Sequence, residues 1–352
     1  MEIRQRAIIL VNLGSPRSAR VPDVRAYLKE FLTDPCVIDL PAWARYLLVY
    51  GIIAPFRAFR SARLYSKIWS DRGFPLIYHT TDVGERVREK LSYDSQLFVA
   101  MRYGEPSLKS VLEQIKQSGF SEVLVIPLYP QFATSTTGSM VRLLRKELAG
   151  HEIGRQFRII PHFHREEPFA SIWVKKIADH DPGSYDALVF SYHGIPVRQT
   201  ELGHPGHDCA SLHCEVHYSE ANRYCYRAAC YHTTRSIARG LGLDAQELYT
   251  SFQSRFGRNW LQPFTDQTLT ELAGRGKKRV LVISPAFVAD CLETLVEIGK
   301  EYSHLFQESG GRELVLVPSL NSDPPWADFI QDLIQKSDHL AVDLWDDVWN
   351  SC

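Results

Sequence analysis

One histidine in the chain stands where acid–base chemistry is expected. His193 follows a short apolar run, residues 188–190, and is followed at once by Gly194 and Pro196. Such a run is typical of a buried strand, and glycine and proline end it. The carboxyl edge of an open α/β sheet is where ligands bind, and imidazole exchanges protons near neutral pH. The sequence therefore predicts a catalytic base at His193, with a hydrogen-bonded structural histidine as the alternative.

Three glutamates, Glu293, Glu297 and Glu301, recur at intervals of four residues. At that spacing they share one face of a helix. A π-helix, with roughly 4.4 residues per turn, would align them better than an α-helix with about 3.6. A ladder of carboxylates can carry a hard cation or protons toward a reacting centre. A solvated acidic face is the alternative interpretation.

A polar stretch without helical or strand periodicity holds four cysteines within 22 residues: Cys209, Cys214, Cys225 and Cys230. The chain has seven cysteines, and an odd number in a cytosolic protein argues against a disulfide framework. A loop with four thiols and no core of its own needs an organising ion. Gaps of four residues resemble the plant-type 2Fe-2S pattern, whereas zinc pairs usually stand two residues apart. Spacing alone leaves 2Fe-2S, structural zinc and free thiols open. The stretch also supplies further candidate zinc ligands: His204, His207, His213 and His217.

Strand-like apolar runs alternate with amphipathic helical patterns along the whole chain. The predicted strands are residues 7–13, 97–101, 123–128, 157–161, 187–191, 248–252, 279–284 and 314–318. One of the helices between them, residues 107–119, has its apolar residues at helical spacing and ends at a glycine. A repeated strand–helix pattern predicts an α/β fold with parallel sheets and active sites at their carboxyl edges. Eight strands predict two sheets of four.

The segment 41–72 interrupts this alternation. Its apolar part, residues 46–56, is followed by a basic flank in which Asp71 is the single acid. The basic residues of the segment are Arg45, Arg57, Arg60, Arg63, Lys67 and Arg72. The apolar part is too short to span a bilayer, but an apolar face with basic residues suits an anionic membrane surface. We expect peripheral membrane contact through residues 41–63, with an amphipathic helix packed on the domain as the alternative.

The composition limits the class of protein. The 352 residues are 45% hydrophobic and 23% charged, which is typical of a soluble globular protein with two domains of ordinary size. The net charge of −1 excludes an overall basic, nucleic-acid-binding protein. Apolar runs stay below the ~18 residues of a spanning helix, and the N-terminus enters a strand without a cleavage site. The expected location is the cytoplasm, with peripheral contact at the inner face of the membrane.

Six motifs follow one another in the order found in a known family. They are NLGSP (12–16), MRYGEPS (101–107), PLYPQFATSTTGS (127–139), SYHGIP (191–196), SFQSRFGRNWLQP (251–263) and PAFVADCLETLVEI (285–298). This set spans most of the chain and resembles the ferrochelatases, the enzymes that insert Fe²⁺ into a porphyrin. Six motifs in register indicate common descent, so the family's fold and activity become the expectation for this chain.

The resemblance implies two similar doubly wound, Rossmann-like domains with four-stranded parallel sheets, facing each other across an active-site cleft. We expect the first domain at residues 1–155, with a lip of the porphyrin pocket at 41–75. The second is expected at 156–318, with the cysteine-rich insertion at 203–230. A C-terminal helical segment, 319–352, is expected to return to the first domain.

The resemblance also assigns roles to residues. His193 and Glu293 match the family's catalytic and iron-binding residues, and Glu297 and Glu301 match its acidic path. Six further residues match positions that bind the porphyrin: Arg102, Tyr103, Tyr65, Gln253, Ser254 and Trp260. An indole offers a flat apolar wall to a flat ligand, although a core tryptophan is the alternative at Trp260.

The activity implied is insertion of Fe²⁺ into protoporphyrin IX, which gives protohaem and releases two protons. The apolar lip favours protoporphyrin IX over coproporphyrin, the alternative substrate. A non-catalytic porphyrin or haem carrier and an iron–sulfur sensor on the same scaffold are the alternatives from other classes. A carrier needs no base beside an acidic ladder, so His193 favours the enzyme. Because many ferrochelatases carry a 2Fe-2S cluster, the resemblance favours such a cluster over structural zinc on Cys209, Cys214, Cys225 and Cys230.

Overall fold

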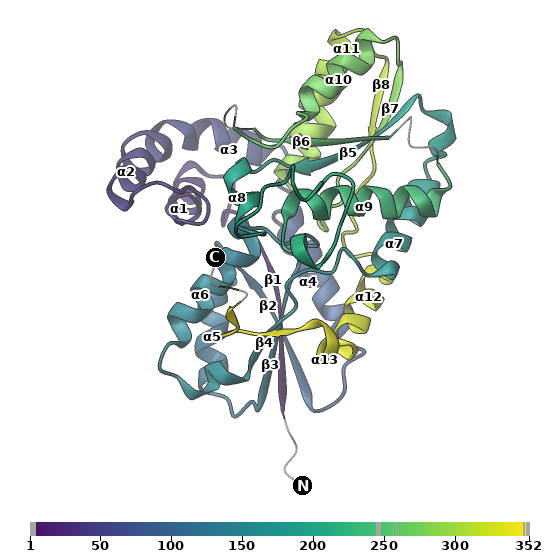
Figure 1. Ribbon diagram of the computed structural model, residues 1–352. Coiled ribbons are helices and arrows are strands. Elements are labelled where there is room, and N and C mark those ends of the chain that lie inside the picture. The colour runs from purple at the N-terminus through teal and green to yellow at the C-terminus, as the bar shows by residue number, and fades with distance from the viewer. Residues whose placement is uncertain (1–4, 244–247, 256, 258, 348, 350–352) are drawn as a thin grey trace. The chain divides into compact units, whose positions relative to one another are not determined.

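The chain folds into two compact α/β units. The computed structural model describes residues 5–243, 248–255, 257, 259–347 and 349 (Figure 1). The first unit comprises residues 1–129, 134–162 and 321–352, and the second comprises residues 130–133 and 163–320. The α/β class and the parallel sheets predicted from the alternation of strands and helices are confirmed.

The first unit is built on a five-stranded sheet in the order β2-β1-β3-β4-β9. Its strands are β1 (Arg6–Asn12), β2 (Ser95–Met101), β3 (Glu122–Pro127), β4 (Phe157–Ile159) and β9 (Val342–Asp343). Strands β1 to β4 are parallel, and β9 pairs with β4 in the antiparallel direction. Strand β1 is hydrogen-bonded to β2 on one side and to β3 on the other, and it is buried from residue 7 to residue 12. Its uninterrupted apolar run is typical of such a buried strand.

The helices of the first unit fill the connections between its strands. They are α1 (Val21–Leu32), α2 (Ala42–Tyr46), η1 (Leu47–Arg57), α3 (Ala58–Ser66), α4 (Pro75–Arg88), α5 (Leu108–Lys116), η2 (Thr134–Gly138), α6 (Ser139–Leu148), η3 (Glu152–Gln156), α12 (Pro324–Gln335) and α13 (Ser337–Leu340). Helix α5 shows why they form. The Ser107 hydroxyl accepts a hydrogen bond from the N–H of Ser110 at 3.2 Å and caps the helix, whose apolar face is buried as predicted.

The second unit is built on a four-stranded, fully parallel sheet in the order β6-β5-β7-β8. Its strands are β5 (Ala187–His193), β6 (Leu248–Gln253), β7 (Arg279–Ile283) and β8 (Glu313–Leu316). Its helices are α7 (Glu167–Ala178), η4 (Pro182–Ser184), α8 (Val197–Glu201), η5 (Glu220–Asn222), α9 (Tyr226–Leu241), α10 (Thr265–Gly274), η7 (Glu293–Tyr302) and α11 (Ser303–Glu308). Strands β5 and β6 end together, with His193 paired to Gln253, so His193 stands at the carboxyl edge.

Two features of the first unit differ from the prediction. Its sheet has five strands rather than four, because the C-terminal segment adds β9. This strand has only two residues and is too short to leave an alternating pattern in the sequence. The predicted boundary at residue 155 falls before β4, but β4 pairs with β3 in the first sheet. The chain therefore enters the second unit at residue 163, after that strand is complete.

Three segments are wound as π-helices, namely η1, η2 and η7. In η1, Pro55 has no N–H to donate, so an irregular helical pattern is tolerated there. The segment η2 lies within one of the six motifs and η7 begins within another, and π-type turns are frequent at functional sites. None of the helices in the described part of the chain is long and apolar enough to cross a bilayer.

Candidate functional site

His193 ends the central strand of the second unit, and its side chain is partly exposed. Its Nδ1 lies 2.7 Å from the carbonyl oxygen of Gly194. A carbonyl oxygen can only accept a hydrogen bond, so Nδ1 carries the proton and Nε2 presents a lone pair. In its neutral form the ring is thereby arranged to act as a base through Nε2.

Gly194 allows the end of β5 to approach its neighbour closely. Its N–H donates to the carbonyl oxygen of Gln253 at 2.8 Å, and a Cβ at this glycine would lie only 2.7 Å from the same oxygen. The indole of Trp260 packs against the same glycine, 3.3 Å from where that Cβ would be. Gln253 and Trp260, two of the predicted porphyrin contacts, therefore lie directly beside the residue that follows His193.

The three glutamates lie on the π-helix η7, which runs over Glu293–Tyr302. With roughly 4.4 residues per turn, this helix keeps residues four apart on one face. Glu293 and Glu297 are half-buried, whereas Glu301 is exposed. The Gln253 amide donates to the backbone carbonyl of Glu293 at 3.4 Å and joins the start of η7 to β6. The carboxylates therefore lead from solvent at Glu301 toward the half-buried Glu293.

Glu297 is held by three hydrogen bonds. Ser254 donates both its N–H, at 2.9 Å, and its hydroxyl, and Tyr302 donates its hydroxyl at 2.8 Å. Ser254 has a left-handed φ of 60°, rare for a residue other than glycine, at the turn where both its donors meet one carboxylate. Burial raises the pKa of Glu297 despite these donors; the carboxylate of Glu293 also raises it and His193 lowers it. Glu297 is therefore an electrostatic neighbour of both His193 and Glu293.

Arg102 and Tyr103 follow β2 in the first unit and are tied to a buried aspartate. Asp34 accepts hydrogen bonds from the Arg102 guanidinium and, at 2.9 Å, from the Tyr103 hydroxyl. The Ser139 hydroxyl donates to the same carboxylate at 2.6 Å and accepts from Nε of Arg102 at 2.8 Å. Tyr103 is 0% exposed, and burial raises its pKa well above the ordinary value, so its hydroxyl stays protonated. Sequence analysis missed Asp34, which lies in none of the motifs, and Ser139, which closes the motif 127–139.

Tyr65, another predicted porphyrin contact, lies on α3 and is 8% exposed. Its ring meets Tyr27 and Phe74 edge-on, with centroids 6.2 Å and 5.2 Å away. Such geometry is favourable for aromatic pairs. The structure therefore places Tyr65 in an aromatic cluster of the first unit.

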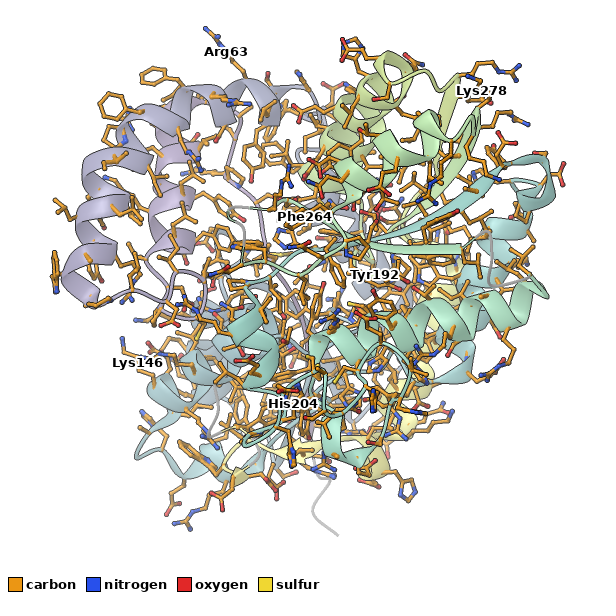
Figure 2. The ribbon with its side chains drawn as sticks, turned by 45° about the horizontal axis from the view of Figure 1, so that its top comes forward. Arg63, Lys146, Tyr192, His204, Phe264 and Lys278 are labelled. Carbon is orange, nitrogen blue, oxygen red and sulfur yellow. The ribbon has the colours of Figure 1, made fainter. Side chains whose placement is uncertain are left out.

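The predicted lip segment, residues 41–75 of the first unit, exposes many large apolar side chains. They are Trp43, Tyr46, Leu47, Tyr50, Ile52, Phe56, Phe59 and Trp69. Exposed basic residues lie among them: Arg57, Arg60, Arg63 and Lys67. Arg63 extends outward from its helix in Figure 2. Arg45, counted with this basic flank, is instead buried, because it donates to the carbonyl oxygen of Leu40 at 2.7 Å.

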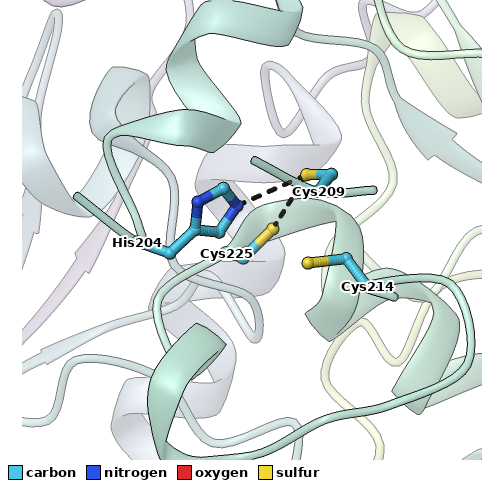
Figure 3. A group of neighbouring side chains, drawn as sticks. All are labelled: His204, Cys209, Cys214 and Cys225. Carbon is cyan, nitrogen blue, oxygen red and sulfur yellow. Dashed lines mark hydrogen bonds between the residues drawn. The ribbon is translucent and has the colours of Figure 1, made fainter. Parts of the chain in front are cut away.

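Three of the four predicted cysteine ligands meet a histidine in the insertion of the second unit. The ligand atoms of His204, Cys209, Cys214 and Cys225 all lie within 4.8 Å of one another (Figure 3). The Sγ of Cys209 is 3.6 Å from that of Cys225 and 3.4 Å from Nε2 of His204. Hydrogen bonding with Cys214 and Cys225 lowers the pKa of Cys209 and favours the thiolate form that binds metals. This group can bind a metal ion.

Cys230, the fourth predicted cysteine ligand, lies outside this group. Cys225 is the N-cap of α9, and Cys230 stands five residues later on the helix. Five residues turn an α-helix by about 140° and advance it by roughly 7.5 Å, so the two side chains leave it on different sides. Cys230 is fully buried, which raises the pKa of its thiol well above the ordinary value. The fourth place is taken by His204, which the sequence named only as an alternative zinc ligand.

Two tyrosines that sequence analysis missed support the candidate catalytic residues. Tyr226, the first residue of α9, donates its hydroxyl to the backbone carbonyl of His193 at 3.0 Å. Tyr302 stands five residues after Glu297, a spacing that brings side chains together on a π-helix and that could have identified it. No local pattern marks Tyr226, because its partner is distant in sequence.

The sequence is similar to that of known proteins over nearly its whole length. The family model described as Ferrochelatase matches residues 5–338. A protein named Ferrochelatase from Pseudomonas savastanoi pv. phaseolicola is 41% identical over 334 residues, which cover 94% of this chain and 98% of that protein. Another of that name, from Coxiella burnetii, is 38% identical over 338 residues, which cover 94% of this chain and 93% of that protein.

Two solved structures are similar to this chain at low sequence identity. SirB from Bacillus subtilis with Fe3+ has a TM-score of 0.52 at 10% identity, and the match covers 95% of each chain. The sirohydrochlorin chelatase SirB from Bacillus subtilis subspecies spizizenii, in complex with cobalt, has a TM-score of 0.53 at 11% identity and the same coverage. At these identities the likeness shows a shared fold alone.

Proposed function

The chain belongs to the ferrochelatase family, and from that premise we propose that it inserts Fe²⁺ into protoporphyrin IX to give protohaem. The observation that carries the proposal is His193, an imidazole at a sheet edge whose Nδ1–H faces the Gly194 carbonyl and which has Glu297 as an electrostatic neighbour. Coproporphyrin, which carries more carboxylates at its rim, is the second candidate substrate.

In the proposed reaction, His193 removes a proton from a pyrrole nitrogen. Two pyrrole N–H protons must leave as Fe²⁺ enters the ring, so a base is needed on one face of the porphyrin. The bond from Nδ1–H to the Gly194 carbonyl leaves Nε2 to accept the proton. The imidazolium that forms is stabilised by the nearby Glu297 carboxylate, whose own pKa His193 lowers.

The acidic ladder is the proposed route for the hard cation and for the released protons. Glu301 is exposed, and Glu297 and Glu293 follow at four-residue intervals on one face of η7. Carboxylate oxygens bind hard cations and accept protons. We assign the substrate iron to Glu293 and His193 before it enters the ring.

Four of the six predicted porphyrin contacts remain proposed contacts, and each is described within its own unit. In the second unit, Trp260 and Gln253 lie beside Gly194, the residue that follows His193. The Trp260 indole supplies an apolar wall. From the first unit, Tyr65 and Arg102 remain proposed contacts, with the fully buried Tyr103 acting through Arg102. Ser254, predicted as a porphyrin contact, uses its N–H and hydroxyl on Glu297, so we assign it to positioning that carboxylate.

We place the protein in the cytoplasm and assign the lip segment (41–75) to peripheral contact with the inner face of the membrane. Its exposed aromatic and aliphatic side chains suit the boundary between headgroups and acyl chains. The exposed basic residues beside them favour anionic lipids. A porphyrin with a large apolar ring and two carboxylates has the same combination of properties.

The 2Fe-2S cluster predicted from the sequence does not enter this mechanism. As predicted it requires a fourth thiolate from Cys230, whose side chain lies outside the group of His204 and three cysteines. The residues present do not fit that ligand set. Catalysis is accordingly assigned to His193 and the glutamates, without a step at the cysteines of the insertion.

An anaerobic assay with purified protein tests the proposed function. Fe²⁺ and protoporphyrin IX are expected to give the absorption spectrum of the metalloporphyrin, with slower turnover of coproporphyrin. Porphyrin binding without metal insertion would instead indicate a carrier or a sensor. Faster turnover of coproporphyrin would assign the chain to the second substrate.

A further inference from the structure

We propose that a buried network of three hydroxyl groups orients the side-chain amide of Gln253 and, through it, the start of η7 at Glu293. The three groups, called the hydroxyl network below, belong to Ser191, Ser251 and Thr265. The inference rests on the proposed function, in which Glu293 is assigned to the substrate iron. It makes the three residues positioning residues, and it refines the porphyrin contact proposed for Gln253, because the amide of that residue binds protein groups.

The second sheet places two of the hydroxyl groups beside the candidate catalytic edge. Ser191 lies two residues before His193 on β5, and Ser251 lies two residues before Gln253 on β6. The strand register pairs Ser191 with Ser251 and His193 with Gln253. Side chains two residues apart on a strand point to the same face, so these four side chains share one face of the sheet. Both serines are 0% exposed.

Thr265 brings the third hydroxyl group from α10, of which it is the first residue. The chain before it is attached to β6, because the N–H of Phe252 donates to the carbonyl oxygen of Pro263 at 2.9 Å. The Thr265 hydroxyl is buried and lies 2.9 Å from the hydroxyl of Ser191 and 2.9 Å from that of Ser251. It therefore bridges β5 and β6.

The last acceptor of the hydroxyl network fixes the direction of every hydrogen bond in it. The backbone carbonyl of Glu293 can only accept, so Nε2 of Gln253, 3.4 Å away, donates to it. Oε1 of the same amide then accepts from the Ser191 hydroxyl at 2.7 Å. Because Ser191 has used its proton, it accepts from Thr265, which accepts from Ser251. The Gln253 amide cannot reverse without breaking two hydrogen bonds in a buried site.

The end of β6 holds η7 at two points. Gln253 binds the backbone carbonyl of Glu293, and Ser254, the next residue, donates its N–H to the carboxylate of Glu297. A reversed Gln253 amide would place Oε1 against the carbonyl oxygen of Glu293, and two acceptors facing each other repel. The hydroxyl network therefore keeps the first turn of η7, and with it Glu293, in position for the substrate iron.

Two serine-to-alanine variants test this assignment. Ser191→Ala removes the donor to Gln253, whereas the matched control Ser251→Ala removes an equally buried hydroxyl group and leaves that donor in place. We expect Ser191→Ala to raise the KM for Fe²⁺ about tenfold and Ser251→Ala to change it less than about twofold. Porphyrin binding, measured by fluorescence titration, should be unchanged in both. An unchanged KM in Ser191→Ala, or an equal rise in the two variants, would overturn the proposal.

A double variant shows whether Ser191 acts through Gln253. Gln253→Met removes the amide at a similar side-chain length. Addition of Ser191→Ala to Gln253→Met is expected to leave the KM for Fe²⁺ where Gln253→Met alone puts it, because changes to one shared contact are not additive. Effects of the two changes that multiply would mean that Ser191 acts independently of Gln253, which contradicts the proposal.

Hydrogen exchange tests the hydroxyl network without catalysis. The backbone amides of η7 are expected to exchange at least about fivefold faster in Ser191→Ala than in Ser251→Ala, because the start of the helix has lost an attachment. Equal exchange in the two variants counts against the network. A wild-type protein that inserts no iron would contradict the proposed function, and this exchange measurement would still decide whether the network holds η7.

Discussion

At the scale of single residues, the candidate catalytic site contains a base whose ring is oriented and an acid whose pKa is set by its surroundings. His193 is oriented by one carbonyl and keeps Nε2 for a substrate proton. Glu297, by contrast, is surrounded by donors that stabilise its ionised form, while burial favours its protonated form. These opposing effects hold a carboxylate that can exchange protons at a higher pH than an ordinary glutamate.

We expect His193→Ala to lower turnover by about a hundredfold or more while porphyrin still binds, because proton removal is its proposed role and ring contact is spread over many side chains. Glu293→Gln is expected to abolish insertion, and Glu301→Gln, at the exposed end of the ladder, only to slow it. Steady-state kinetics and porphyrin fluorescence titration measure both quantities. Near-normal turnover in His193→Ala would contradict the assignment of His193 as the base. Complete loss of turnover in both Glu293→Gln and Glu301→Gln would mean that the ladder acts as one site.

The pH dependence of metal insertion should follow the ionisation of the Glu297 carboxyl group. Its carboxylate must be ionised to take a cation, so its raised pKa is expected to set the acid limb of kcat/KM. Ser254→Ala removes a donor that lowers this pKa, so the limb should move to higher pH by roughly one unit. Tyr302→Phe is expected to shift it in the same direction, and Glu297→Gln to remove it. An acid limb that stays in place in both Ser254→Ala and Tyr302→Phe contradicts the assignment.

At the scale of elements, the insertion and the catalytic strand share helix α9. Cys225 caps that helix, and Tyr226, the next residue, donates to the carbonyl oxygen of His193. At the other side of the loop, α8 begins at Val197 and carries Thr200, which contacts Cys209. The segment between β5 and α8 is therefore attached at both ends to the candidate metal group.

Tyr226→Phe tests this connection. Loss of one hydrogen bond is expected to cost about 1 kcal/mol in the free energy of unfolding and to lower kcat about fivefold, with KM little changed. Metal content should stay the same, because the ligands are untouched. Tyr218→Phe, which removes a hydroxyl that donates to the Arg223 carbonyl within the insertion, is the matched control and should leave kcat unchanged. Equal kcat in the two variants would show that Tyr226 does not position His193.

At the scale of the whole chain, the proposed tasks are divided between the two units. The base, the acidic ladder and the metal group belong to the second unit, whereas the lip segment and the buried Asp34 network belong to the first. The first unit is also where most of the large exposed apolar side chains lie, including Trp43 and Phe56, each 74% exposed. A concentration of large exposed apolar side chains in one segment is typical of a site that contacts a membrane or a protein.

Vesicle binding tests the lip segment. The double change Trp43→Glu with Phe56→Glu is expected to weaken binding to anionic vesicles at least about tenfold, because two apolar anchors are lost and two negative charges added. Metal insertion into a detergent-dispersed porphyrin, measured with the same variant, separates a loss of lipid contact from a loss of porphyrin contact at the lip segment. Tyr93→Glu, at a side chain that is 93% exposed elsewhere in the first unit, is the matched control. Equal vesicle binding by the double variant and the wild type would show that this surface does not contact lipid.

Features that depend on residues close together in the chain could be predicted from the sequence alone. Apolar runs located the eight longer strands, because a buried strand needs a continuous apolar stretch. The four-residue spacing of the glutamates anticipated a π-helix, and the order of the motifs identified the family. These signals are local, so a single sequence carries them.

The contacts between distant side chains depend on the tertiary fold. It brought Ser254 to Glu297, Tyr226 to His193 and Asp34 to Arg102, pairs that are separated by tens of residues and share no pattern. It also placed His204 rather than Cys230 with the three cysteines. The spacing of the cysteines could not reveal this, because the direction in which a side chain leaves a helix depends on where the helix begins. Cys225 is the N-cap of α9 and Cys230 lies within the helix. Their side chains, five residues apart in sequence, therefore point in different directions.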